Sequence, residues 1–87
     1  MKEEINNDRV LVEKLKGGDI ACFELLYSKY SGKLYNYVLS LSKGDFYLAE
    51  EIVQNVFVKI WEIRQHISTE GSFNSFVYTV GRNMFLN

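Results

Sequence analysis

The amino-acid sequence predicts an all-α protein, a compact bundle of about four helices. The chain contains no proline, and its long runs of helix-forming residues are interrupted by glycine and turn residues. No segment shows the alternation of polar and apolar residues that is typical of a strand. The 87 residues, of which 47% are hydrophobic, can build one core and leave no room for a second. We therefore expect one domain over residues 1–87.

The first helix is expected from Asn7 to Lys16, with Asn7 or Asp8 as its N-cap and the pair Gly17 and Gly18 ending it. Its apolar positions are Val10, Leu11 and Leu15.

Asp19 is expected to cap a second helix that runs to about Ser42, with Gly32 as a point where the helix bends or divides in two. Apolar residues recur along it at helical spacing, and we expect them to face the core. They are Ile20, Phe23, Leu26, Tyr27, Tyr30, Leu34, Tyr37, Val38 and Leu41.

The segment Ser42 to Asp45 combines a stop with a new cap, and a third helix should follow to about His66. A hydroxyl-rich loop from Ile67 to Ser72 comes next. The fourth helix should start near Ser72 or Phe73 and continue to the end of the chain. Its expected inward stripe is Phe73, Phe76, Val77, Val80 and Met84.

The third helix is predicted to have two different faces, because successive residues are about 100° apart on a helix. The side expected to face the core carries Ala49, Ile52, Val53, Val56, Ile60, Ile63 and Ile67. The opposite side carries Tyr47, Glu50, Glu51, Gln54, Asn55, Val58, Trp61, Glu62 and Gln65. Val58 and Trp61 are an apolar pair at i, i+3 spacing on this side, and an apolar centre among acids and amides is typical of a protein-binding patch. The alternative is that a neighbouring segment, such as the N-terminal helix, covers Trp61.

Composition excludes several classes of protein. Cys22 is the single cysteine, so the chain can form no internal disulfide. No apolar run approaches the roughly 18 residues of a membrane span, and the N-terminal "MKEEINNDR" lacks the apolar core of a signal peptide. These observations favour a cytoplasmic protein. The net charge of -1, without a block of basic residues, argues against binding to duplex nucleic acid mainly through phosphates.

Patterns that would indicate an enzyme are weak, and we expect no enzymatic activity, metal or cofactor. Glu62 and His66 are spaced i, i+4 but have no third metal-binding residue nearby. The neighbours Glu50 and Glu51 point about 100° apart and would not flank one substrate. No glycine-rich phosphate loop precedes a helix, and Cys22 is best explained as a small buried thiol.

Three segments together carry a resemblance to a known family. "KGGDIACFELLYSKY", "GDFYLAEEIVQNVFVKIW" and "SFNSFVYTVGRN" follow one another in the order and spacing found in region 2, the promoter-reading region, of bacterial sigma factors of the extracytoplasmic-function group. The match covers the chain from Val10 to Asn83. The resemblance implies that residues 1–87 are a sigma region 2 domain of a transcription initiation factor.

Full-length members of this family continue through a linker into a second helical domain that recognises the minus-35 element. The resemblance therefore implies that the chain is a fragment of a longer protein, with a genuine one-domain protein as the lesser alternative.

The resemblance also implies a partner for the polar side of the third helix. In the family this side contacts the clamp coiled coil of the RNA polymerase β′ subunit. The matching residues are Glu50, Glu51, Gln54, Asn55, Val58 and Trp61. Amides and carboxylates can meet arginine and backbone groups of a partner helix, and an apolar residue can supply the desolvated centre.

The loop and the outer face of the last helix would, by the same resemblance, read the minus-10 promoter element and accept a flipped base of the non-template strand. The implied DNA-binding residues are Ser68, Thr69, Ser72, Asn74, Ser75, Thr79, Arg82 and Asn83. Asn83 is the best single candidate for a base contact. The alternative is structural, because solvated loops are rich in hydroxyls and an asparagine near a helix end often only caps it.

The sequence departs from the family at several positions. Asn55 stands where an acid is usual, Phe76 where tryptophan is commonest and Gly81 where alanine is frequent. Gly81 costs up to about 1 kcal/mol inside a helix, which indicates either the close approach of a neighbour or loose packing. From residue 67 to 87 the formal charges are Glu70 and Arg82 alone, so polymerase would have to supply most of the affinity for promoter DNA.

A second class of function fits the same pattern. The chain could be a helical interaction module whose polar third-helix face docks a regulatory partner without DNA contact. In the family, anti-sigma proteins occupy the polymerase and promoter surfaces, so an anti-sigma factor is an expected partner under either hypothesis.

Overall fold

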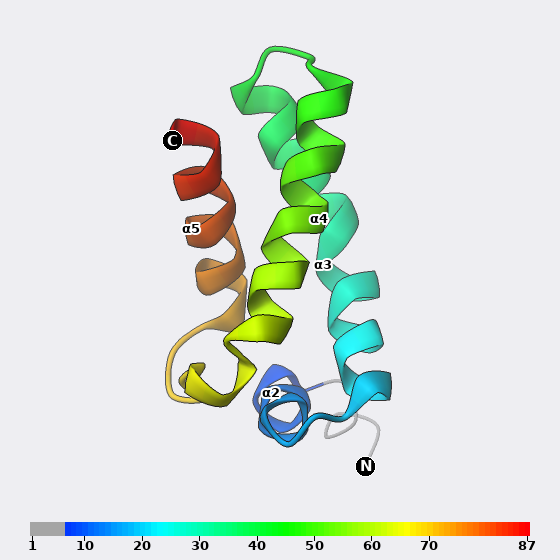
Figure 1. Cartoon of the computed structure of the whole chain (residues 1–87), viewed down its shortest axis with the longest axis vertical. Helices are drawn as coiled ribbons and strands as arrows, with labels where there is room; N and C mark the ends of the chain where they lie inside the picture. Colours follow the sequence, from blue (N-terminus) through cyan, green and yellow to red (C-terminus); the bar gives the residue numbers. More distant parts are fainter. Residues whose placement is uncertain (1–6) are drawn as a thin grey trace.

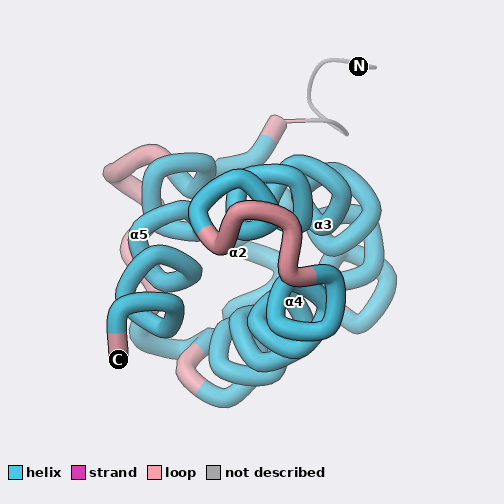
Figure 2. The backbone as a smooth tube through the Cα atoms, turned by 90° about the horizontal axis from the view of Figure 1, so that it is seen from above, coloured by secondary structure: helices cyan, strands magenta, loops and turns pink. Residues whose placement is uncertain are grey.

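Four α-helices and a short 3-10 turn form the structure, a computed structural model that describes residues 7–87. The elements are α2 (Asp8–Lys16), α3 (Ile20–Leu41), α4 (Phe46–Glu62), η1 (Arg64–His66) and α5 (Phe73–Leu86). Helices α3, α4 and α5 run alongside one another, and α2 lies across their lower ends (Figure 1). Seen along the bundle, the three long helices surround a common interior (Figure 2). The predicted all-α class is confirmed.

Each helix begins where the sequence places a capping side chain. A side-chain oxygen accepts a hydrogen bond from a backbone N–H of the first turn, which satisfies a donor that the helix itself leaves free. The pairs are Asn7 with Arg9 N at 2.8 Å, Asp19 with Cys22 N at 3.0 Å, Asp45 with Leu48 N at 3.0 Å, and Ser72 with Ser75 N at 3.1 Å. The predicted helix starts are therefore confirmed.

Of the two alternatives at Gly32, division of the helix is wrong, because α3 continues through this residue. A Cβ at this position would meet nothing within 4 Å. The predicted end of the third helix is also wrong. Helix α4 ends at Glu62 instead of near His66. The chain tightens there into η1, in which His66 N donates to Ile63 O at 2.8 Å. The Arg64 guanidinium donates to Trp61 O at 2.8 Å and so satisfies a carbonyl at the end of α4.

The core draws on all four helices. The most deeply buried side chains are Leu15, Leu26, Leu34, Ile60, Val12, Val38, Val56 and Val77. The expected core side of α4 is confirmed apart from Ile63, which is half-buried, and Phe57 joins it although the pattern did not include it. On α2, Val12 faces the core and Val10 is half-buried. On α3, the assignment of Ile20 and Tyr27 to the core is wrong, because they are 53% and 41% exposed.

Gly81 marks a close approach between α5 and α3. A Cβ added at Gly81 would lie 2.7 Å from Cδ1 of Leu34, which is completely buried. This separation is well inside van der Waals contact. Of the two explanations for a glycine here, close approach of a neighbour is confirmed.

A polar cluster holds α2 against α3. The Tyr30 hydroxyl donates a hydrogen bond to one carboxylate oxygen of Asp8, and Lys29 Nζ lies 2.7 Å from the other oxygen. The Tyr30 ring also packs edge to face against Phe73, with centroids 5.5 Å apart. Tyr30 thus links the first helix, the second and the start of α5.

The Tyr30 hydroxyl should make the stability of the fold depend on pH above about 10. Burial, followed by the hydrogen bond to Asp8 and the charge of Asp8, raises the pKa of Tyr30 above its ordinary value of 10.0. Below pH 10 the phenol is protonated in both states. Above it the unfolded phenol ionises first, so the free energy of unfolding should fall as pH rises. Tyr30→Phe should reduce this slope in urea titrations between about pH 8 and 11.

Tyr47, which is 87% exposed, provides the matched control for this measurement. Tyr47→Phe should leave the alkaline slope unchanged. An equal slope in the Tyr30→Phe protein and the original protein would contradict the prediction.

Within residues 7–87, no helix is long and apolar enough to cross a membrane. Residues 1–6, for which the sequence predicts no signal peptide, lie outside the described range.

Candidate functional site

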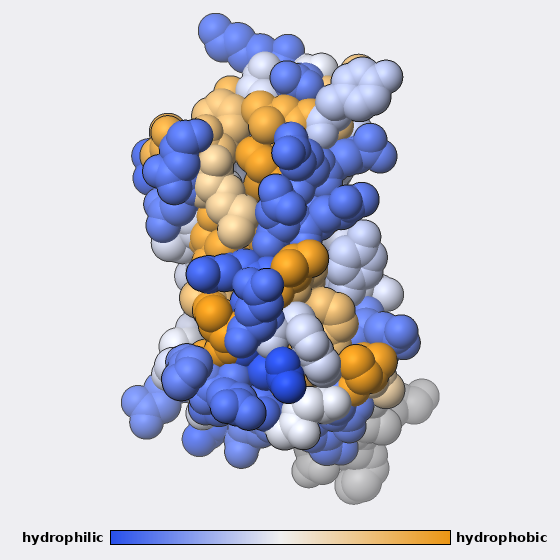
Figure 3. Space-filling view, viewed as in Figure 1, coloured by the Kyte–Doolittle hydropathy of each residue, from blue (hydrophilic) through white to orange (hydrophobic). Residues whose placement is uncertain are grey.

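The outer side of α4 is arranged as the sequence predicts. Glu50, Glu51, Gln54 and Asn55 are exposed, Val58 is 55% exposed and Trp61 is half-buried. The opposite side of the helix is buried in the core. In Figure 3, apolar side chains reach the surface among hydrophilic ones along the face that α4 presents. The predicted division of α4 into a core face and an outer face is therefore confirmed.

An apolar groove lies between α3 and α4 beside this outer side. Its volume is about 520 Å³, and its lining residues are Phe23, Tyr27, Gln54, Phe57, Val58, Trp61 and Glu62. Trp61 packs edge-on against Phe23 with ring centroids 5.2 Å apart, and Tyr27 packs in the same way on Phe57 at 5.0 Å. The Trp61 ring also lies beneath the guanidinium of Arg64 in η1. Segments other than the N-terminal helix therefore cover part of this ring, which also lines the groove.

A second, more polar groove continues along the same two helices. It has a volume of about 370 Å³ and is lined by Tyr27, Ser31, Gly32, Tyr35, Asn36, Glu50, Val53 and Gln54. Because Tyr27 and Gln54 line both hollows, the two lie end to end. We call them together the α3–α4 groove.

Sequence reasoning missed the contribution of α3 to this groove. Its aromatic residues recur at helical spacing, and this pattern was interpreted as a core stripe alone. Phe23 and Tyr27 lie at i and i+4 on one side of the helix and line the groove. Phe23 also packs against the core, whereas Tyr27 is exposed.

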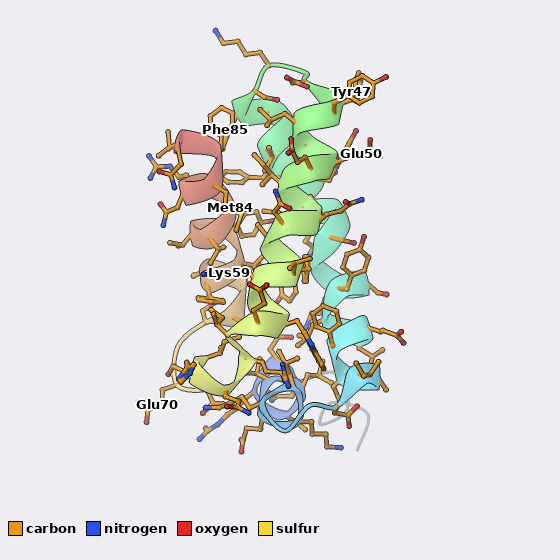
Figure 4. The ribbon with its side chains drawn as sticks, viewed as in Figure 1. Tyr47, Glu50, Lys59, Glu70, Met84 and Phe85 are labelled. Carbon is orange, nitrogen blue, oxygen red and sulfur yellow. The ribbon has the colours of Figure 1, made fainter. Side chains whose placement is uncertain are left out.

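The loop from Ile67 to Ser72 is fixed at both ends. The Ile67 side chain is buried, and Ser72 caps α5. Ser68 Oγ accepts a hydrogen bond from Glu70 N at 3.1 Å, whereas the Glu70 side chain points away from the bundle (Figure 4). Both serine hydroxyls therefore accept a hydrogen bond from the local backbone. Each hydroxyl can still donate its own proton to another acceptor.

The outer side of α5 brings three predicted residues into one row. Ser75, Thr79 and Asn83 follow one another at i, i+4 spacing, and all are exposed. Arg82 is exposed beside this row. Asn74 is also exposed but lies about 100° around the helix from Ser75, so it does not join them. Thr69 is half-buried in the loop.

Asn83 borders a third hollow, between α4 and α5. Its volume is about 390 Å³, and it is lined by Lys59, Ile63, Val80, Asn83, Met84 and Asn87. Lys59 lies on the side of α4 that faces α5 and its residue Met84, whereas Glu50 lies on the side of α4 toward α3 (Figure 4). Lys59 is not among the site residues predicted from the sequence. Its place at the edge of the apolar side, four residues before Ile63, was the signal available.

Glu62 and His66 have the spacing of two metal ligands on one helical face. They do not share such a face, because α4 ends at Glu62 and His66 lies in η1. In the described part of the chain, no group of three or more histidine, cysteine or acidic side chains is placed to hold a metal ion.

Comparison with known proteins assigns the fold to a family. The model of the sigma-70 region 2 family matches residues 26–87, which include α4, the loop and α5. The chain belongs to the sigma-70 region 2 family. This sigma region 2 domain is 28% identical over 88 residues to the ECF RNA polymerase sigma-E factor of Haemophilus influenzae. The alignment takes in all of the chain and 44% of that relative, so the chain spans less than half of the relative's length. No solved structure matches the chain significantly.

The resemblance predicted from the three motifs is therefore confirmed at the level of the family and of the extracytoplasmic-function group. As a sigma region 2 domain, the chain has the character of a transcription initiation factor domain. All the residues proposed for polymerase and promoter contact fall inside the matched range.

Proposed function

We propose that this domain binds RNA polymerase core by placing the β′ clamp helices along the α3–α4 groove, and that it recognises and helps to melt the minus-10 element through the loop and α5. The observation that carries the first part is the apolar hollow at Trp61 and Val58, which is bordered by carboxylates and amides. A desolvated aromatic centre with a polar rim is the composition of a binding hot spot.

The polar rim of the groove suits a helical partner. Glu50, Glu51, Gln54 and Asn55 project from successive turns of α4 and can pair with arginine or backbone groups of the clamp. Exposed carboxylates contribute more to orientation and association rate than to affinity. Trp61 and Val58 would then supply most of the binding energy, and the rim would set the register.

The row on α5 suits an unpaired DNA strand. A base that has left the stack exposes its hydrogen-bonding edge, which the Asn83 amide can both donate to and accept from. Lys59 shares the hollow with Asn83 and can pair with a nearby phosphate. Arg82 lies on the outer side of the same helix. We therefore extend the predicted DNA-binding set by Lys59.

The polymerase contact can be tested by capture of the domain on immobilised β′ clamp helices. Gln54→Ala should weaken capture, because Gln54 lies where the two parts of the groove meet. We expect a loss of about three- to tenfold, the range of a single rim hydrogen bond. Glu13→Ala, an exposed change on α2, should leave capture unchanged. Equal capture of both folded variants would refute this assignment of the groove.

The promoter contact can be tested with labelled single-stranded minus-10 DNA. Asn83→Ala should reduce the preference for the promoter sequence over a scrambled strand, whereas Lys59→Ala should weaken both strands about equally. Asn36→Ala provides an amide control, because Asn36 lies on α3 and lines the α3–α4 groove, not the hollow at Asn83. If the preference survives Asn83→Ala, the assignment of base contact to this residue is wrong.

A regulatory interaction module without DNA contact is the second candidate function. It is favoured by the sparse charge of the loop and α5, where Glu70 and Arg82 are the charged residues. An anti-sigma protein could occupy the α3–α4 groove as well as polymerase can. The single-stranded DNA assay separates the two candidates, because this second function predicts no difference between promoter and scrambled strands.

A further inference from the structure

Arg64 lies where α4, η1 and the turn between α2 and α3 come together. Its guanidinium carbon lies 4.1 Å from the centre of the Trp61 ring, and its Nη1 donates to Trp61 O at 2.8 Å. It is also the first residue of η1, which leads into the promoter-reading loop. One side chain therefore contacts both the aromatic residue of the groove and the end of the helix that carries it.

The surroundings of Arg64 fix its position closely. Gly18 has φ +90°, and a Cβ built there would lie 4.0 Å from Nε of Arg64. The turn between α2 and α3 therefore comes close to the Arg64 side chain. Helix α2 also packs on η1. The Trp61 ring and this turn together limit the positions that the guanidinium can take.

The hydrogen bonding of Arg64 is not optimal for stability alone. Its Nε is buried and has no hydrogen-bond partner within the described residues. A buried donor without a partner carries a desolvation penalty, and such groups in folded proteins call for a specific explanation. The position of the guanidinium over the Trp61 ring offsets part of this penalty, because the face of an indole attracts a cation.

We propose that Arg64 is a positioning residue that holds the Trp61 indole in the α3–α4 groove and the η1 turn before the promoter loop in one fixed arrangement. The inference rests on the proposed function of the two surfaces. Because Arg64 stacks on Trp61 and begins the segment that leads to Ile67, its loss affects polymerase capture and recognition of the unpaired strand together.

The chain contains one tryptophan, so its fluorescence reports directly on this contact. Arg64→Met removes the guanidinium and the unpaired Nε while it keeps an unbranched side chain of similar length. We expect the Trp61 emission to shift and acrylamide quenching to increase, while the thermal midpoint stays close to that of the original protein. Arg9→Met, an exposed change on α2, is the matched control and should alter neither signal.

Binding of the clamp helices and of single-stranded minus-10 DNA is then measured on the same proteins. Arg64→Met should weaken each by about fivefold, the scale of one cation–π contact at a partly exposed site. Arg64→Lys keeps the positive charge and should therefore recover part of each affinity. The recovery should be incomplete, because an ammonium group lacks the planar fork that lets the guanidinium stack on the ring and cap the helix together. Arg9→Met should bind both ligands as the original protein does.

Two results would overturn the inference. One is unchanged affinity of folded Arg64→Met for both ligands, and the other is loss of clamp binding with full retention of DNA binding. If Arg64→Met is too unstable to measure, Arg64→Lys gives the same comparison at the same temperature. Failure of the proposed function is recognised separately, because Gln54→Ala and Asn83→Ala would then also be without effect.

Discussion

Trp61→Ala should lower the affinity of the domain for the β′ clamp helices by roughly 30-fold or more, the scale of a binding hot spot. Trp61 supplies the largest ring of the apolar hollow and is held edge-on by Phe23. Truncation removes the aromatic surface that a partner helix would desolvate. The measurement is a titration of immobilised clamp helices, with circular dichroism to establish that the variant is folded.

Val58→Glu tests the same hollow without disturbing the core, because Val58 is 55% exposed. A carboxylate at this position would be buried by the partner without a counter-ion, and the cost should match or exceed that of losing the valine. Glu51→Gln, a neighbouring exposed change on α4, should have a far smaller effect. Normal capture of Val58→Glu would show that the clamp binds elsewhere.

Leu34→Ala should reduce the free energy of unfolding by about 2 to 5 kcal/mol, the usual cost of deleting a buried leucine. Leu34 is completely buried and packs against α5 at Gly81. Gly81→Ala alone should cost about 1 kcal/mol, since overpacking against Leu34 outweighs the gain in helix propensity. Urea unfolding monitored by circular dichroism measures both changes.

The double variant shows whether the two residues interact directly. In Leu34→Ala with Gly81→Ala, the new methyl group can enter the space that the leucine vacates. The combined loss should therefore be smaller than the sum by about 1 kcal/mol or more. Gly32→Ala is the control, because its Cβ meets nothing within 4 Å and α3 should gain stability. Strictly additive losses would contradict the packing described here.

Much of the fold could be predicted because its determinants are local. Asp19, Asp45 and Ser72 each cap a helix through a nearby backbone N–H, and the division of α4 follows from the rotation per residue. The end of α4 could not be predicted in this way. It depends on Arg64, whose side chain caps the helix, stacks on Trp61 and packs on Gly18 from another element.

The candidate site was predictable on α4 and less so elsewhere. Periodicity separates exposed from buried positions on one helix, but it does not tell which neighbouring helix forms a groove. Phe23 and Tyr27 were therefore assigned to the core, although they line the groove with Trp61. Lys59 was missed for the same reason. Its proximity to Asn83 depends on how α5 lies against α4.

Few cations lie beside the surface proposed to read DNA, and this limits how many counterions binding would release. Lys59 borders the hollow at Asn83, and Arg82 lies on the outer side of α5. Two such cations would give a slope of about -1.4 for log affinity against log salt on single strands. Affinity would then fall about sevenfold between roughly 50 and 200 mM salt, whereas proteins with six to ten phosphate contacts lose about 10³ to 10⁵. Binding of an unpaired strand by this domain would therefore depend far less on ionic strength than DNA binding by a strongly basic protein does.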